Sequence, residues 1–160
     1  MTKQAQNSNK NALNIETIKS LREETGAGVM DIKRALDEAG GSVQKAKELL
    51  QKAGFEKAEK KSQRETGDGS VFSYAHSTTK IGSIVVLRCE TDFVAKTEGF
   101  KNLGKEIAMH IAAMNPKDIE ELMSQVYIRD SSRTIEMLIK EVIVKTGENI
   151  TVGEFARLGV

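Results

Sequence analysis

The sequence predicts an α+β fold, in which a helical bundle comes first and a small antiparallel sheet of about three strands, covered by helices, follows. Over residues 15–55, apolar residues recur at helical spacing in three segments that each end at glycine. From residue 70 the apolar residues alternate instead, which is typical of strands. We therefore expect a disordered tail over residues 1–14, a three-helix module over 15–55, a linker over 56–69 and an α+β core over 70–160.

The composition excludes several classes of protein. The net charge of +1, from 24 lysines and arginines against 23 aspartates and glutamates, provides no general attraction to nucleic acid or to an anionic membrane. Cys89 is the only cysteine, which excludes an intrachain disulfide and a cysteine-based zinc site and indicates a reducing compartment. Residues 84–87, the longest apolar run, are too few to span a membrane, and residues 1–14 lack the apolar core of a signal peptide. We expect a cytoplasmic protein without a metal or other cofactor.

The three helices predicted for the module each have one apolar face and a clear end. Gly26 follows the first helix and is suited to a left-handed C-terminal cap. The second helix ends at Gly40, and the third takes Ser42 as its N-cap and ends at Gly54. A bundle of this size has little interior for a catalytic pocket, so we expect it to serve as a binding surface.

The predicted linker, residues 56–69, contains few apolar side chains and reads as helical only at its start. Its lysines and its arginine alternate with acidic residues, which cancel the field of the cations, and Phe55 is the only aromatic residue nearby. A solvated surface is therefore favoured over a nucleic-acid patch, and RNA binding is the weakest of the functions considered.

The core begins with a predicted hairpin, SVFSYAH and IGSIVVLRCE, joined by a polar STTK turn. Its second strand is rich in β-branched residues and should lie at the centre of the sheet. Gly82 in that strand indicates a bulge or a close approach by another backbone.

Two helices and a third strand should complete the core. Thr97 is suited to cap a long amphipathic helix that ends before Pro116 and covers the sheet. After a short segment at residues 119–123, Ser131 or Ser132 can start a second helix, and Gly147 ends it. The last segment, NITVGEFARL, predicts a strand.

The turn between the second strand and the long helix has an unusual composition. Such turns are usually polar and small, yet this one reads TDFV, so Phe93 is either packed in the core or exposed as a probe. Asp92 could simply favour the first turn of a following helix, and Phe93 could form a hydrophobic staple. No Glu or Gln stands three residues after Thr91 to complete a capping box, which weakens the local explanation. The residues alone leave the structural and the binding roles evenly balanced.

Several segments together resemble a known family. IKSLREETGAGVMDIKRALDEAGGSVQKAKELL resembles the N-terminal, UBA-like module of the elongation factor Ts family, and CETDFVAK is similar to its core signature. KIG with AMHIAAMNP, and KTGENITV, resemble later blocks of the same family. These segments cover most of residues 15–155. The chain departs from the family in being shorter than its usual members, with elements trimmed between Pro116 and Tyr127.

The resemblance implies a guanine-nucleotide exchange factor that binds elongation factor Tu·GDP and promotes the release of GDP without a chemical step, so it implies no enzyme. In the family, the matches to Lys19, Val29 and Met30 contact the nucleotide-binding domain of elongation factor Tu. The TDFV turn pushes between two helices of that domain, and other matches lie on neighbouring contact surface. The implied partner-binding residues of the core are Ile81, Gly82, Thr91, Asp92, Phe93, Val94 and His110. Because shorter members resemble half of a longer, internally duplicated one, we also expect a homodimer.

Without the resemblance, most of these residues have a plain structural explanation. Val29 and Met30 would lie in the core of the bundle, since a methionine at helical spacing is usually packed. Lys19 would be a solvated lysine, and Ile81 and Gly82 would be ordinary residues at the start of a strand. His110 would be a satisfied histidine at the boundary of the core.

Two alternative functions come from other classes. An enzyme would need Cys89 as its nucleophile with His76 or His110 as the base, but a cysteine near the end of an apolar strand is usually buried and inert. The chain also lacks the common nucleotide-binding, metalloprotease and hydrolase motifs. The other alternative is a partner-binding helical module on an inert scaffold without exchange activity, in which residues 1–56 would bind as tightly as the whole chain.

Overall fold

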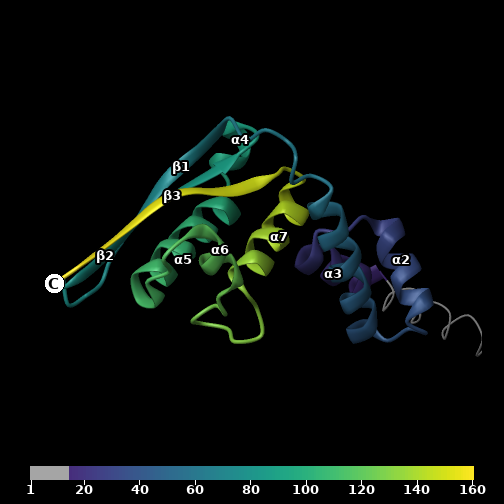
Figure 1. Cartoon of the computed structure of the whole chain (residues 1–160). Helices are drawn as coiled ribbons and strands as arrows, with labels where there is room; N and C mark the ends of the chain where they lie inside the picture. Colours follow the sequence, from purple (N-terminus) through teal and green to yellow (C-terminus); the bar gives the residue numbers. More distant parts are fainter. Residues whose placement is uncertain (1–14) are drawn as a thin grey trace, which may run out of the picture. The chain divides into compact units, whose positions relative to one another are not determined.

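The computed structural model describes residues 15–160, and the chain divides into two compact units after Lys57 (Figure 1). The first unit is helical, and the second combines a three-stranded antiparallel sheet with helices. The predicted α+β class is confirmed. The tail predicted for residues 1–14 lies outside the described residues.

The first unit is built from a helix over residues 15–25, helix α2 (Val29–Glu38) and most of helix α3 (Val43–Glu59). Gly26 and Gly40 have the left-handed backbone conformation expected of the residues that end a helix, with φ of 70° and 60°. One apolar cluster forms the core of the bundle, and its buried members are Leu21, Ile32, Ala35, Leu36, Ala46 and Leu50.

Helix α3 does not end at Gly54, as the sequence predicts, but continues to Glu59. A glycine inside a helix costs only about 1 kcal/mol relative to alanine, so packing further along the helix can outweigh it. Ala58 supplies such packing, because it is 2% exposed within the core of the second unit.

The segment expected to be a linker, residues 56–69, is instead held to the second unit. After α3 it makes a series of turns, and strand β1 (Asp68–Ala75) begins two residues before the predicted start at Ser70. The side chain of Asn149 donates hydrogen bonds to the backbone carbonyls of Ser62, at 3.3 Å, and Arg64, at 2.8 Å. Sequence composition could not reveal these contacts, since the amide comes from a distant part of the chain.

The sheet has the order β1-β2-β3, in which β2 (Ile81–Cys89) is central and β3 (Ile150–Gly159) pairs with it antiparallel. The register between β2 and β3 shifts between Val85 and Leu87, rather than at Gly82. Gly82 is instead a place of close approach, because a Cβ atom there would lie 3.3 Å from the carbonyl oxygen of Tyr74.

Helices α5 (Glu98–Met114), α6 (Ile119–Ser124) and α7 (Ile135–Thr146) lie on one side of this sheet (Figure 1). Thr97 caps α5 as predicted, its hydroxyl accepting a hydrogen bond from the N–H of Phe100. Helix α7, however, is capped by Thr134 and not by Ser131 or Ser132. Ser132 is unavailable because both its N–H and its hydroxyl donate to the carboxylate of Asp130.

The opposite face of the sheet carries exposed apolar side chains. Phe72 and Val85 pack in or against the core, and the residues that alternate with them in the register point the other way. Val71 is 60% exposed, Ile84 is 47% exposed, and Leu158 of β3 is 79% exposed. Among residues 15–160, no helix is long and apolar enough to cross a membrane.

Candidate functional site

The TDFV turn, residues 91–94, connects the end of β2 to the four-residue helix α4 (Asp92–Ala95). Val94 and Ala95 are buried, with exposed fractions of 7% and 8%, whereas Phe93 is 79% exposed. Phe93 is therefore not packed in the core. The turn presents one large, rigid apolar side chain to the solvent, which is the kind of group that anchors protein interfaces.

Asp92 is the first residue of α4, where the partial positive charge of the helix N-terminus favours a carboxylate. It forms an ion pair with Lys96, one turn further on, at 2.5 Å. The hydrogen bond from Lys96, and then the charge of that lysine, lower the pKa of Asp92. Asp92 is thus ionised at neutral pH beside the exposed ring of Phe93.

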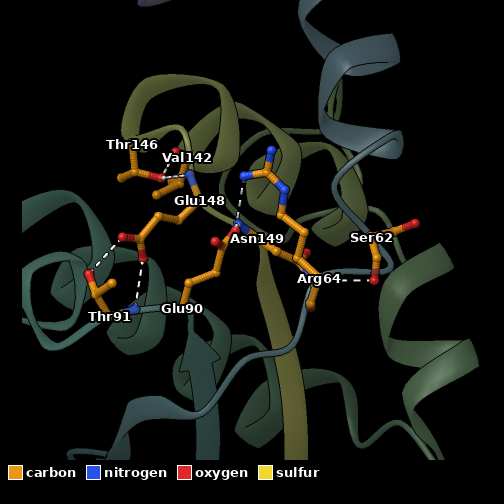
Figure 2. Close-up of polar contacts among 8 residues, drawn as sticks. All are labelled: Ser62, Arg64, Glu90, Thr91, Val142, Thr146, Glu148 and Asn149. Atoms are coloured by element: carbon orange, nitrogen blue, oxygen red, sulfur yellow. Dashed lines mark hydrogen bonds and ion pairs between the residues drawn. The ribbon is translucent and has the colours of Figure 1, made fainter.

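Thr91 is held by a residue far away in the sequence. Its hydroxyl donates to Oε1 of Glu148 at 2.6 Å, and its backbone N–H donates to Oε2 of the same carboxylate at 3.0 Å (Figure 2). As a result, Thr91 stands at the N-cap position of α4 without making a side-chain capping bond to that helix. Sequence reasoning missed Glu148, because KTGENITV was noted only as a block of the family and no local pattern pairs it with the turn.

A second link joins the same two segments one residue further along. Asn149 is 2% exposed as a residue, and its backbone N–H donates to Oε1 of Glu90 at 2.6 Å. Arg64 lies 3.5 Å from the same carboxylate (Figure 2). The residues before and at the start of the turn are thereby both tied to the segment that follows α7.

Cys89 has the surroundings of a structural thiol. It is buried, and its Sγ–H group donates to the carbonyl oxygen of Thr91 at 3.1 Å. Burial, followed by the negative charges of Glu148 and Asp68, raises the pKa of Cys89, which disfavours the reactive thiolate. Within residues 15–160, His76 forms hydrogen bonds within its own turn and His110 forms one with Gln125. Neither histidine is hydrogen-bonded to the thiol of Cys89.

Among residues 15–160, no group of three or more histidine, cysteine, aspartate or glutamate side chains is arranged to hold a metal ion. The candidate site is formed by the exposed ring of Phe93, the neighbouring carboxylate of Asp92 and the contacts that fix Thr91.

His110 does not lie on a surface, contrary to the expectation that it adjoins the partner contact. It is 0% exposed, and its Nε2 lies 2.9 Å from Oε1 of Gln125 while Nδ1 has no hydrogen-bond partner. Burial lowers the pKa of His110 and so keeps the imidazole neutral. Gln125, the residue directly after α6, and the ring of Tyr127, whose centroid lies 6.2 Å from that of the imidazole, lie against His110.

In the first unit, Val29 and Met30 begin α2 and are 39% and 69% exposed. The structural explanation considered apart from the resemblance, in which both pack in the bundle core, is therefore wrong. On α2 that core is formed by Ile32, Ala35 and Leu36 instead. Lys19, on the first helix, is also exposed.

Ile81 and Gly82 are half-buried at the start of β2, whereas the TDFV turn follows its end. At roughly 3.3 Å for each residue of a strand, the length of β2 separates them from the turn by about 25 Å. The structure thus brings together residues 91–94 with Glu148 and Glu90, and does not bring Ile81 or Gly82 to them.

Comparison with known proteins finds matches over nearly the whole chain. Residues 90–160 match the family model described as Elongation factor TS. An elongation factor Ts from Leptospira biflexa serovar Patoc is 42% identical over 194 aligned positions, which cover 93% of this chain and 98% of that protein. An elongation factor Ts from Thermosipho melanesiensis is 38% identical over 92% of this chain and 98% of its own length, and one from Nitratidesulfovibrio vulgaris is 37% identical over 92% and 96%. Because the alignments have more positions than this chain has residues, the relatives contain residues with no counterpart here.

Proposed function

The chain belongs to the elongation factor Ts family, and from that premise we propose that it binds elongation factor Tu·GDP and promotes GDP release by inserting the TDFV turn into the nucleotide-binding domain of that partner. Membership of this family implies a nucleotide exchange factor rather than an enzyme. The observation that carries the proposal is the 79% exposure of Phe93, on a turn whose other apolar residues are buried.

Exchange of this kind requires only differential binding. Suppose that this chain binds the nucleotide-free partner more tightly than the GDP-bound partner. By thermodynamic linkage, binding of the chain must then lower the affinity of the partner for GDP by the same ratio. The Phe93 ring is the proposed wedge, entering an apolar crevice and shifting a helix that helps to place Mg²⁺ and the phosphate-binding loop. Backbone N–H groups of such loops hold the phosphates, so a small displacement is enough to release the nucleotide.

The proposal divides the work between the two units. Val29 and Met30, which are exposed, and Lys19 dock the first unit on the partner, and the TDFV turn of the second unit acts on the nucleotide site. Ile81 and Gly82 belong to a neighbouring contact of the second unit. His110 is not among the proposed contacts, because it is buried.

The decisive test measures the release of a fluorescent GDP analogue from elongation factor Tu, with excess Mg²⁺ and unlabelled GDP. We expect the chain to accelerate release strongly and Phe93→Ala to remove most of this effect, since truncation of an anchoring aromatic residue costs about 2 kcal/mol or more at an interface. Ile119→Ala is the matched control, because Ile119 is also an exposed apolar residue, on α6. If Phe93→Ala released nucleotide as fast as the unmodified chain, the wedge would be refuted.

The alternative is a partner-binding helical module on a scaffold without exchange activity. It predicts that the chain binds elongation factor Tu without accelerating GDP release, and that Phe93→Ala leaves the affinity unchanged. Binding measured by calorimetry on the same variants separates the two functions. The exposure of Phe93 supports exchange, because a large, rigid aromatic side chain in solvent is suited to anchor an interface.

A homodimer is also part of the proposal, as are a cytoplasmic location and the lack of a direct nucleic-acid or membrane partner. The exposed apolar face of the sheet, with Val71, Ile84 and Leu158, supports a second copy of the chain as its cover. A chain that corresponds to half of an internally duplicated protein would use the second copy as the missing half.

A further inference from the structure

We propose that Glu148 is a positioning residue for nucleotide exchange: its carboxylate holds Thr91 and thereby orients the side chain of Phe93 before the partner binds. This inference rests on the proposed function and deepens it, because Glu148 lies outside the TDFV turn and touches neither the nucleotide nor the wedge.

The geometry at Thr91 leaves none of its polar atoms without a partner. The two oxygens of the Glu148 carboxylate accept from the hydroxyl, at 2.6 Å, and from the backbone N–H, at 3.0 Å (Figure 2). The carbonyl oxygen accepts from Sγ–H of Cys89 at 3.1 Å and from the N–H of Ala95 at 3.3 Å. Both the backbone and the side-chain torsion of Thr91 are therefore fixed, two residues before the wedge.

Helix α4 by itself contributes little to fixing Thr91 at the start of the turn. It has only four residues, and isolated helices of that length are unstable in water. The N-cap residue makes no capping bond to the helix, since the Thr91 hydroxyl is directed to Glu148 instead. Asp92 and Lys96 form an exposed pair within the helix, which is worth little to its stability.

Glu148 is itself fixed by the end of α7. Gly147 ends that helix in the left-handed conformation, with φ of 80°, and its N–H donates to the carbonyl of Ile143 at 2.8 Å. The N–H of Glu148 then lies 3.4 Å from Oγ1 of Thr146, and the next residue, Asn149, is bonded to Glu90. The carboxylate thus reaches Thr91 from the short bonded segment between α7 and β3 of the same unit.

A fixed turn has a distinct kinetic consequence. Insertion of Phe93 costs less conformational entropy when the turn is already ordered. Loss of the hydrogen bonds between Glu148 and Thr91 should therefore slow the insertion step. Docking through the first unit does not involve residue 148. Loss of Glu148 should therefore lower the maximal rate of GDP release while leaving the half-saturating concentration of the factor nearly unchanged.

A merely structural role for Glu148 would produce the opposite pattern. In an experiment with labelled GDP on elongation factor Tu and this chain in excess, a partly unfolded factor acts only as a lower concentration of factor. It would raise the half-saturating concentration and leave the maximal rate as it was. The two kinetic constants therefore distinguish positioning from stability.

The test is a stopped-flow titration of GDP release with the full chain and its variants. We expect Glu148→Ala to lower the maximal rate roughly tenfold, as the loss of two hydrogen bonds to a charged group allows. Glu148→Gln should recover most of the rate, because its amide oxygen can accept from the Thr91 N–H and its amide nitrogen can donate to the Thr91 hydroxyl oxygen. Asp130→Ala is the matched control, since Oδ1 of Asp130 also accepts from the N–H and the hydroxyl of one residue, Ser132, away from the turn.

Thr91→Val provides an independent variant that keeps the shape of the residue and its N–H group. It should lower the maximal rate by itself and add little to Glu148→Ala, because both changes remove the same interaction. An unchanged maximal rate in Glu148→Ala, or additive effects in the double variant, would overturn the positioning role while the proposed function stood. No acceleration by the unmodified chain would overturn both.

Discussion

Phe93 and Val94 are neighbours in the chain with opposite surroundings. Successive residues of a helix leave its axis about 100° apart, so even the single turn of α4 directs one side chain to the core and the next to solvent. Val94 is 7% exposed and packs in the core, whereas Phe93 is 79% exposed, as the proposed insertion into a partner requires. This division would allow one apolar turn to serve both the fold and the proposed interface.

His110 predicts an acid-dependent loss of stability. Because burial lowers its pKa in the folded state, the unfolded chain binds a proton that the folded chain does not, below a pH of about 6.5. The contribution of neutral His110 to stability is present above that pH and is lost as the pH falls towards the folded-state value.

We expect the free energy of unfolding, measured with urea, to fall between pH 7 and pH 5.5, and to fall less in His110→Gln, which keeps a nitrogen for the contact with Gln125 but does not titrate. His76→Gln, which makes the same substitution at an exposed histidine in the β1–β2 turn, is the matched control. If the free energy of unfolding of His110→Gln fell with pH as steeply as that of the unmodified chain, groups other than His110 would cause the loss of stability in acid.

Glu148, which bonds to Thr91 of the turn, directly follows Gly147, the glycine that ends α7. Among the predicted helix ends, those with a left-handed glycine are where the sequence is most informative, because few other residues accept that conformation. Gly26, Gly40 and Gly147 were placed correctly on this basis. The prediction of a helix end at Gly54 was wrong, because a glycine can also adopt ordinary helical torsions. The prediction that Ser131 or Ser132 starts α7 was wrong too, because the Ser132 hydroxyl donates to the carboxylate of Asp130 instead.

Gly147→Ala and Gly99→Ala should have opposite effects on stability. Gly147 has φ of 80°, and a Cβ atom there would meet no closer atom than Nζ of Lys61 at 4.0 Å, so the cost is the strained backbone, about 1 kcal/mol. Gly99 lies in the first turn of α5 with nothing within 4 Å, so alanine should stabilise the chain by about 0.5 kcal/mol through a less flexible unfolded state. Urea unfolding of both variants checks the signs, and an equal effect of the two would contradict the role of the Gly147 conformation.

The second unit as a whole is a two-layer structure with helices on one face of its sheet. Layered folds usually bury both faces of a sheet or expose a polar one, and here the open face carries Val71, Ile84 and Leu158. This face is the reason for proposing a second copy of the chain as its cover.

Leu158→Lys should convert the proposed dimer to a monomer, because it would bury a charge at the interface. Sedimentation equilibrium should give twice the chain mass of 17.6 kDa for the unmodified protein and the mass of one chain for the variant. Ile119→Lys places the same charge on another exposed apolar position, on α6, and should remain dimeric. A monomer at every concentration of the unmodified chain would exclude the homodimer.

Local patterns in the sequence were enough for the fold class, the order of the elements, the central position of β2 and the unusual turn at residues 91–94. They suffice because hydrophobic periodicity, caps and turn residues act over a few neighbouring positions. The exposure of Phe93 and Met30 and the burial of His110 depended on how the elements pack, since the same residue types occur on either face of a helix. The hold of Glu148 on Thr91 depended on the tertiary structure alone, because 57 positions separate the two residues and only the antiparallel pairing of β2 with β3 brings them together.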